Sequence, residues 1–196
     1  MSHYFVTPEG PEHRQQITAR IWDREYAFTT ANGVFSGSRL DLGTSVLLRS
    51  IAPPEDGPLR LLDLGCGFGP IAVALAHACP SARVDAVDVN DRALELTRLN
   101  AAAAGVQMRV GRPEGFADVS YDQIWSNPPI RIGKDALHEL LATWLGRLAP
   151  GGVANLVVGR NLGADSLQAW LGGQGWATTR VASAKGFRVL RVHAEQ

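Results

Sequence analysis

Apolar positions follow two different periods along the chain, and each change of period marks an expected element. From residue 59 onward, short apolar runs alternate with segments whose apolar residues recur every three or four positions. Strands are predicted at 59–65, 83–89, 106–110, 121–125 and 151–159. Helices are predicted at 70–79, 91–105, 134–149 and 164–175. The first strand is almost continuously apolar, which is typical of a strand buried on both faces of a parallel sheet.

The helix expected at 134–149 shows the strongest pattern. Its apolar residues fall on one helical face, and they are Leu137, Leu140, Leu141, Trp144, Leu145 and Leu148. Pro70 suits the first turn of the helix at 70–79, and Gly105 suits the end of the helix at 91–105.

The two ends of the chain add further elements. The segment 176–194 indicates two strands around Ala184–Lys185–Gly186, and 14–30 indicates one or two strands followed by a helix at 41–52. The sequence therefore predicts an α/β, three-layer fold with a mostly parallel, seven-stranded sheet that closes in a C-terminal antiparallel hairpin. We expect a single domain over 1–196, with an N-terminal β/α leader at 1–52 and a core at 59–196.

Composition supports a globular, cytoplasmic protein. Of the 196 residues, 45% are hydrophobic and 19% are charged. No run of about 18 apolar residues predicts a membrane span, and the N-terminus lacks the pattern of a signal peptide. The cysteines, Cys66 and Cys79, are expected to be buried thiols, and we expect no metal site.

Charge is balanced over the whole chain but not along it. The formal net charge is +0, which argues against a general polyanion binder. Residues 128–196 carry eight Lys or Arg against four acids, whereas 61–127 carry five Arg against eight acids. The basic C-terminal third indicates either a surface for nucleic acid or a solvated surface with chance clustering.

A glycine-rich turn joins the first core strand to its helix in "LLDLGCGFGP" (61–70). Its glycines allow close approach of a ligand to the backbone, and their G-x-G-x-G spacing differs from that of dinucleotide sites. An acid precedes the turn, and no phosphate-binding lysine follows it. This pattern suits a ligand with a cationic end, such as S-adenosylmethionine; the alternative is a turn that only packs a helix on a strand. The candidate cofactor residues are Asp63, Gly65, Cys66 and Gly67.

A second acid has the spacing of a ribose ligand. Asp88 lies 21 positions after Gly67 at the end of the next strand, where an acid in doubly wound folds accepts hydrogen bonds from ribose hydroxyls. Val89 adjoins it and is a further cofactor candidate. Asp85 is a weaker candidate because it falls in the middle of the strand.

The stretch "SNPPI" (126–130) follows the fourth strand. Both Asn127 and Pro128 precede a proline, so both are restricted to extended conformations, and Pro128 and Pro129 have no backbone N–H. The Asn127 side-chain oxygen and the Pro128 carbonyl then form a rigid pair of acceptors for the hydrogens of an amine. Asn127, Pro128, Pro129 and Ile130 are therefore the candidate catalytic residues. This chemistry needs no histidine, so His77 and His138 are expected to be surface or packing residues.

Together, "DLGCGFG", "AVDVN" and "SNPPI" resemble the motifs of Rossmann-like S-adenosylmethionine-dependent methyltransferases that act on amino groups. The flanks "FTTANGVFSGSRLDLGTSVLL", "NPPIRIGKDALHELL" and "KGFRVLRV" resemble the family of small-subunit ribosomal RNA guanine-N2 methyltransferases and its single-domain relatives. The resemblance runs from His3 to Val192. It implies S-adenosylmethionine as the cofactor, guanine N2 as the acceptor, and ribosomal RNA or the small subunit as the partner.

The resemblance also implies roles for other residues near the cofactor. It places Asp41–Thr44, and with it Gly43 and Thr44, against the methionine end of the cofactor; alternatively this stretch only caps a helix. Relatives carry an acid or amide after the third strand for the adenine amine, where this chain has Pro113 followed by Glu114.

The candidate substrate residues follow from the same resemblance. Ile130 stands where other nucleic-acid amino methyltransferases often have an aromatic residue that stacks on a flipped base. Phe35 could cover the base instead, or it could be a core residue. Arg39, Arg131 and Lys134 could contact phosphates. Larger ribosomal enzymes of this type carry a further N-terminal domain, so we expect RNA selection to rest with the single domain or with a partner.

Two other functions are compatible with the sequence. In one, the acceptor amine belongs to a protein glutamine, a DNA or tRNA base, or a small molecule. In the other, the chain is a non-catalytic RNA-binding relative, although such copies usually lose the glycines or the asparagine that are present here.

Overall fold

The computed structural model describes residues 12–34, 39–129 and 132–194. Its main sheet has seven strands in the order β5-β4-β3-β6-β7-β9-β8. The strands are β3 (Arg60–Leu64), β4 (Arg83–Val87), β5 (Arg109–Gly111), β6 (Tyr121–Ser126), β7 (Leu148–Gly159), β8 (Ala177–Ala184) and β9 (Phe187–His193). The first five are parallel to one another, and β9 runs antiparallel to both β7 and β8. The predicted mixed sheet with a closing hairpin is confirmed.

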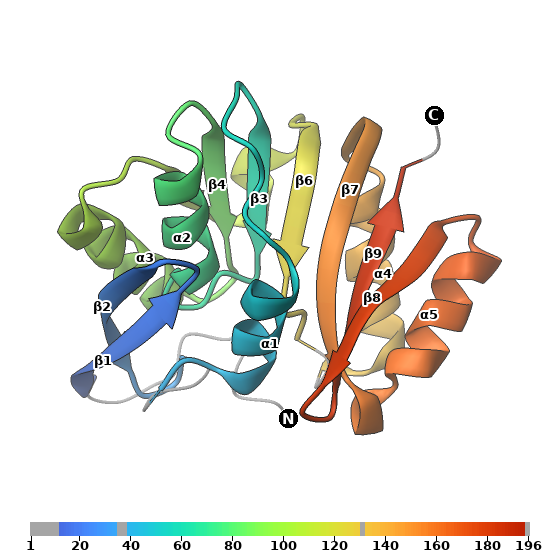
Figure 1. The fold of residues 1–196 in the computed structure, drawn as a ribbon, viewed down its shortest axis with the longest axis horizontal. Helices are drawn as coiled ribbons and strands as arrows, with labels where there is room; N and C mark the ends of the chain where they lie inside the picture. The colour runs from blue at the N-terminus through green and yellow to red at the C-terminus, as the bar shows by residue number, and fades with distance from the viewer. Residues whose placement is uncertain (1–11, 35–38, 130–131, 195–196) are drawn as a thin grey trace.

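Helices cover both faces of this sheet (Figure 1). They are α1 (Leu42–Ser50), α2 (Pro70–Ala78), α3 (Asp91–Ala104), α4 (Lys134–Leu145) and α5 (Ala164–Gly173). One apolar core joins α1, α2 and α3 to the sheet, and a second joins α4 and α5 to the other face. Neighbouring strand residues serve different cores because side chains alternate across a strand: Leu61 belongs to the first core and Leu62 to the second.

The predicted boundaries differ from the structure where strand pairing overrides a local pattern. Leu148 was expected on the apolar face of the helix at 134–149, and this is wrong: α4 ends at Leu145, and Leu148 begins β7. The Tyr121 N–H donates to the Arg147 carbonyl at 2.8 Å, and Tyr121 pairs with Leu148. The third strand is also shorter than the expected 106–110 and begins at Arg109.

The leader forms a separate antiparallel hairpin, β1 (Arg14–Ile21) and β2 (Arg24–Ala31), followed by α1. The two-residue turn of the hairpin places Trp22 at φ 49°. The Trp22 indole Nε1 donates to the Ile51 carbonyl at 3.1 Å, which joins the turn to the end of α1.

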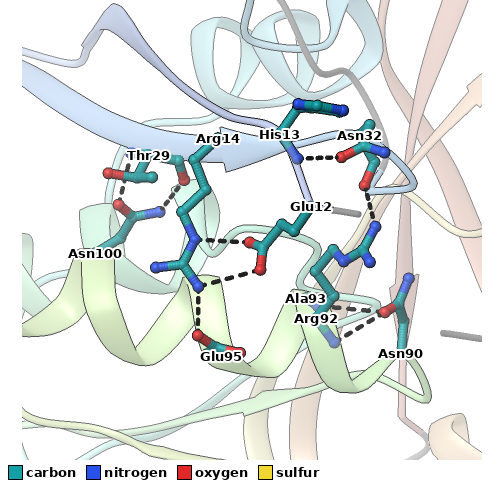
Figure 2. Close-up of polar contacts among 10 residues, drawn as sticks. All are labelled: Glu12, His13, Arg14, Thr29, Asn32, Asn90, Arg92, Ala93, Glu95 and Asn100. Carbon is teal, nitrogen blue, oxygen red and sulfur yellow. Dashed lines mark hydrogen bonds and ion pairs between the residues drawn. The ribbon is translucent and has the colours of Figure 1, made fainter. Parts of the chain in front are cut away.

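Polar side chains of α3 hold the hairpin in place (Figure 2). The Asn100 side chain accepts from the Thr29 N–H and donates to the Thr29 carbonyl, both at 2.8 Å, and also donates to the Phe68 carbonyl at 2.8 Å. In the first turn of the helix, Arg92 donates to the Asn32 carbonyl at 2.8 Å. Asn100 therefore connects β2 to the loop that follows β3.

Replacing Asn100 with alanine should destabilise the protein through these three lost hydrogen bonds. Each buried group left without a partner costs about 1–3 kcal/mol, so we expect the loss of three bonds to lower the free energy of unfolding by about 3 kcal/mol or more in a urea titration. The exposed pair of Arg14 in β1 with Glu95 in α3 offers a control between the same hairpin and helix, and Arg14→Ala should leave the unfolding midpoint nearly unchanged. Similar midpoints for both variants would contradict this role of Asn100.

Candidate functional site

A cavity of about 800 Å³ opens at the carboxyl ends of β3, β4 and β6. β3 pairs in parallel with β4 on one side and β6 on the other, so the strand order reverses at this point. Open α/β sheets bind ligands at such a reversal. The cavity walls combine the turn after β3, the residues after β4 and β6, and parts of α1, α4 and β9. The wall residues used below are Asp41, Thr44, Gly65, Cys66, Gly67, Asp88, Val89, Asn90, Pro113, Asn127, Pro128, Pro129, Leu140, Trp144 and Phe187.

The glycine-rich turn takes a backbone course that L side chains rarely adopt. Gly65, Gly67 and Gly69 have φ values of 75°, 57° and 88°. A Cβ at Gly69 would also lie 2.9 Å from the Thr97 side chain. The turn thus brings its backbone against α3 on one side and against the cavity on the other.

Asp88 lies directly after β4 and faces this turn. Its carboxylate accepts from the Gly67 N–H and from the Asn90 N–H, both at 3.0 Å. Burial raises the pKa of Asp88 in spite of these bonds. Each oxygen still has a lone pair for a hydroxyl of a ligand. Val89, next to it, is 38% exposed on the cavity wall.

Asp85, the weaker ribose candidate, is bonded to other side chains of the protein instead. Its carboxylate accepts from the Tyr121 hydroxyl at 2.9 Å and forms two bonds with Arg109, at 2.8 and 2.7 Å. Asp85 does not line the cavity.

Asp63 is buried beneath the glycine turn, outside the cavity lining. Its Oδ2 accepts from the Ala72 N–H of α2 at 2.9 Å, whereas its Oδ1 has no hydrogen-bond partner among the described residues. Burial raises the pKa of Asp63 to about 8, and the charge of Asp88 adds to the increase. An acid with an unused buried oxygen is a natural counterion for a cationic ligand above it.

Asn127 stands at the end of β6, which is tied to β3 by a bond from the Ser126 hydroxyl to the Leu64 carbonyl at 2.7 Å. The Asn127 Nδ2 donates to Asp41 Oδ2 at 2.7 Å and to Thr44 Oγ1 at 3.2 Å. No described residue donates to Asn127 Oδ1. The side chain lines the cavity together with the prolines that follow it.

Other predicted residues lie around this centre. Cys66 lines the cavity with its sulfur 3.4 Å from Thr97 Oγ1, and burial raises the pKa of its thiol. Glu114 is exposed on a short 3-10 helix (Pro113–Phe116), and it is Pro113 that lines the cavity.

The predicted substrate residues lie only partly within the described residues. Lys134 is exposed at the start of α4, and Arg39 is exposed two residues before Asp41. Phe35, Ile130 and Arg131 lie outside the described residues.

Several wall residues were missed by sequence reasoning. Asp41 was expected against the methionine end of the cofactor or as a helix cap, and its Oδ2 does accept from the Thr44 N–H at 3.0 Å, but its contact with Asn127 was not foreseen. Asn90 caps α3 and also lines the cavity. Leu140 and Trp144 were assigned to a helix face and also form part of the wall. Phe187 gave no signal of its own, because its place in the wall depends on the pairing of β9 with β7.

The histidines lie outside the cavity lining. The His138 ring stacks on Trp170 with centroids 3.9 Å apart, and the His77 ring lies 5.5 Å from that of Tyr26. In the described part of the chain, no three metal-binding side chains gather, and no helix is long and apolar enough to cross a membrane.

Asp63→Asn should change how stability depends on pH. The pKa of Asp63 is about 8 in the folded protein, above the value of about 3.9 expected when unfolded. The folded state therefore holds one more proton between these values, and this stabilising contribution is lost as pH rises from about 4 to about 8. Relative to the variant, the ligand-free wild-type protein should lose free energy of unfolding over that range in urea titrations. Parallel pH profiles of the two proteins would show that Asp63 ionises normally.

The chain is similar in sequence and in structure to known proteins. The family model for the methyltransferase small domain matches residues 25–191. The uncharacterized protein YbxB of Bacillus subtilis is 32% identical over 170 residues, which cover 84% of each chain. Ribosomal RNA small subunit methyltransferase C of Shewanella loihica is 35% identical over 79% of this chain and 47% of its own length.

The solved structures confirm the predicted Rossmann-like methyltransferase fold. The 16S rRNA N2 G1207 methyltransferase of T. thermophilus, solved with AdoMet and guanosine, aligns with a TM-score of 0.77 and 25% identity. The alignment covers 96% of this chain and 52% of the Thermus chain. This chain thus spans about half the length of the ribosomal RNA methyltransferases that it matches. With a family match over most of its length, the chain belongs to the methyltransferase small domain family.

Proposed function

We propose that this protein transfers a methyl group from S-adenosylmethionine to the exocyclic N2 amine of a guanine in ribosomal RNA. The observation that carries the proposal is the Asn127 side chain at the cavity wall, whose nitrogen is bonded within the protein and whose oxygen has no described donor. The matched relatives in Shewanella and Thermus are named as ribosomal RNA methyltransferases.

The cavity residues fit S-adenosylmethionine as the cofactor. Asp88 can accept from the ribose hydroxyls beside the glycine turn, and the apolar Val89 and Pro113 can contact the adenine. Asp63, whose Oδ1 is unpaired beneath the turn, can ionise when a cation approaches and so favours the cationic amino-acid end. When bound, the cofactor supplies an electrophilic methyl group. The family of this chain and the AdoMet bound to the Thermus relative support S-adenosylmethionine as the cofactor.

The residues after β6 would orient the amine. The lone pair of a guanine N2 amine is conjugated with the ring, which makes it a poor nucleophile. Asn127 Oδ1 and the Pro128 carbonyl can accept its two hydrogens and so turn the lone pair toward the methyl group. Because the prolines fix the backbone and Ser126 ties it to β3, these acceptors are preorganised. Positioning of this kind can contribute several kcal/mol to lowering a barrier. The methylated amine is acidic and loses its proton to water.

The apolar part of the cavity lining suits a flat base. It includes Pro129, Leu140, Trp144 and Phe187. Phe35 and Ile130 are proposed as further contacts to the base, and Arg39, Arg131 and Lys134 as contacts to phosphates. We propose ribosomal RNA or the small ribosomal subunit as the partner, because the surplus of basic residues lies in the C-terminal third.

Methylation assays on small subunits and on deproteinised ribosomal RNA test the function directly. With labelled S-adenosylmethionine, wild-type protein should produce N2-methylguanosine, identified by nucleoside mass spectrometry. Asn127→Ala should lower kcat by about 100-fold or more, the usual effect of removing a preorganised electrostatic contact. Its cofactor Kd should change little, because the Asp88 side of the cavity is intact.

A matched control is available on α5. Gln168→Ala removes another side-chain amide outside the cavity, and it should retain wild-type turnover. Absence of labelled N2-methylguanosine on both substrates would refute the proposed acceptor, and label in another nucleoside or in protein would identify a different one. Unchanged turnover of Asn127→Ala would refute the role of the side chain.

A further inference from the structure

The shorter of two bonds between the leader and Asn127 is made by a carboxylate. Asp41 lies immediately before α1, and its Oδ2 accepts from Asn127 Nδ2 at 2.7 Å across 86 positions of sequence. The same oxygen accepts from the Thr44 N–H at 3.0 Å, which fixes the carboxylate at the N-terminus of the helix. The helix dipole favours negative charge at this place.

The chemistry of this contact determines which way the Asn127 amide points. An ionised carboxylate can only accept hydrogen bonds, so the atom 2.7 Å from Asp41 must be the amide nitrogen. Thr44 Oγ1, at 3.2 Å, accepts the second hydrogen of the same nitrogen. If the amide were rotated by half a turn, two acceptor oxygens would face each other at this short distance. The amide oxygen is therefore directed away from Asp41.

The charge on Asp41 also acts on the amide itself. Hydrogen bonds to ionised acceptors are roughly twice as strong as neutral ones. Bonds in a chain polarise one another, so donation to the carboxylate makes Asn127 Oδ1 a stronger acceptor. The amide is therefore already held in one orientation before any substrate enters, which is the condition for preorganisation.

Gly43 provides the space for this contact. A Cβ at Gly43 would lie 3.0 Å from Asp41 Oδ2, 3.2 Å from Asn127 Nδ2 and 2.9 Å from Phe187 Cε1. α1 packs on β7 and β9, so it cannot retreat without disturbing the sheet. The glycine of the "DLGT" stretch is thus explained by the Asp41–Asn127 contact.

We propose that Asp41 is a positioning residue for the methyl transfer. It fixes the Asn127 amide so that Oδ1 faces the cavity as the acceptor for the substrate amine. This role rests on the proposed function, and Asp41 itself does not touch the reacting atoms.

The first test reads the amide directly and needs no methyl acceptor. In a nitrogen–proton correlation spectrum, the Asn127 side-chain signals are assigned by their loss in Asn127→Ala. Asp41→Ser keeps a good helix cap but is too short to reach Asn127. The Asn127 signals should move toward the positions of solvent-exposed amides in this variant. Signals that stay at their wild-type positions would overturn the proposal.

The second test uses kinetics and a charge exchange. Asp41→Ser should lower kcat between about tenfold and about a hundredfold with the cofactor KM within about twofold. Asn127→Asp should be impaired because two carboxylates then face each other. In the double variant Asp41→Asn/Asn127→Asp, the new amide can donate to the new carboxylate while its oxygen caps α1. We expect the double variant to recover at least about tenfold of the activity lost in Asn127→Asp, or about 1.4 kcal/mol of transition-state stabilisation.

The outcomes separate this role from its alternatives. A raised cofactor KM with unchanged kcat in Asp41→Ser would make Asp41 a cofactor ligand and overturn the proposal, as would a double variant no better than Asn127→Asp. Gly43→Ala, which leaves both partners in place, should reproduce the shift of the Asn127 signals in a weaker form. If wild-type protein methylates neither RNA substrate, the proposed function fails, whereas the amide spectrum still decides how Asp41 acts on Asn127.

Discussion

The arrangement of this site depends on one bond between the leader and the sheet, from the Asn127 amide to the Asp41 carboxylate at 2.7 Å. An amide presents a donor and an acceptor of nearly equal size, and only its surroundings decide which of them faces a ligand. β6 delivers Asn127 to the cavity, but nothing in the strand itself selects the oxygen. The selection comes from Asp41, whose own position is fixed by the first turn of α1.

The leader is in turn held by the side of the molecule that carries the glycine turn. Asn100 bonds both to Thr29 in β2 and to the Phe68 carbonyl in the turn after β3. The indole of Trp22 bonds to the end of α1. The glycine turn and the Asn127 side of the cavity are thus connected through the hairpin as well as through the sheet. We infer that the leader belongs to the site as fully as the core does.

Sequence reasoning succeeded where the signal is local and failed where it depends on distant contacts. The alternation of strands and helices, the glycine turn and the proline pair are local patterns, and they predicted the sheet, its closing hairpin and the cavity edge. Leu148 fits the helical spacing of apolar residues, but it pairs with Tyr121 in the sheet. The spacing of apolar residues carries no information about strand pairing. Asp41 was predicted near the cofactor or as a helix cap, but its bond to Asn127 was not predicted because that partner lies 86 positions away. Phe187 reaches the cavity only through the register of β9 on β7.

The two acids near the glycine turn show how this cavity balances charge. Burial raises the pKa of Asp88, and it raises that of Asp63 to about 8. Without a cation nearby, at least one of these carboxylates is costly to ionise. A ligand with a cationic end would lower both pKa values, and the cost of ionising a protonated carboxylate would offset part of the attraction between the two charges. Near Asn127 the carboxylate of Asp41 is already bonded to a helix N-terminus and to an amide. Acids without such partners therefore lie beside the glycine turn, whereas the Asn127 side offers neutral oxygens, as the proposed transfer to a neutral amine requires.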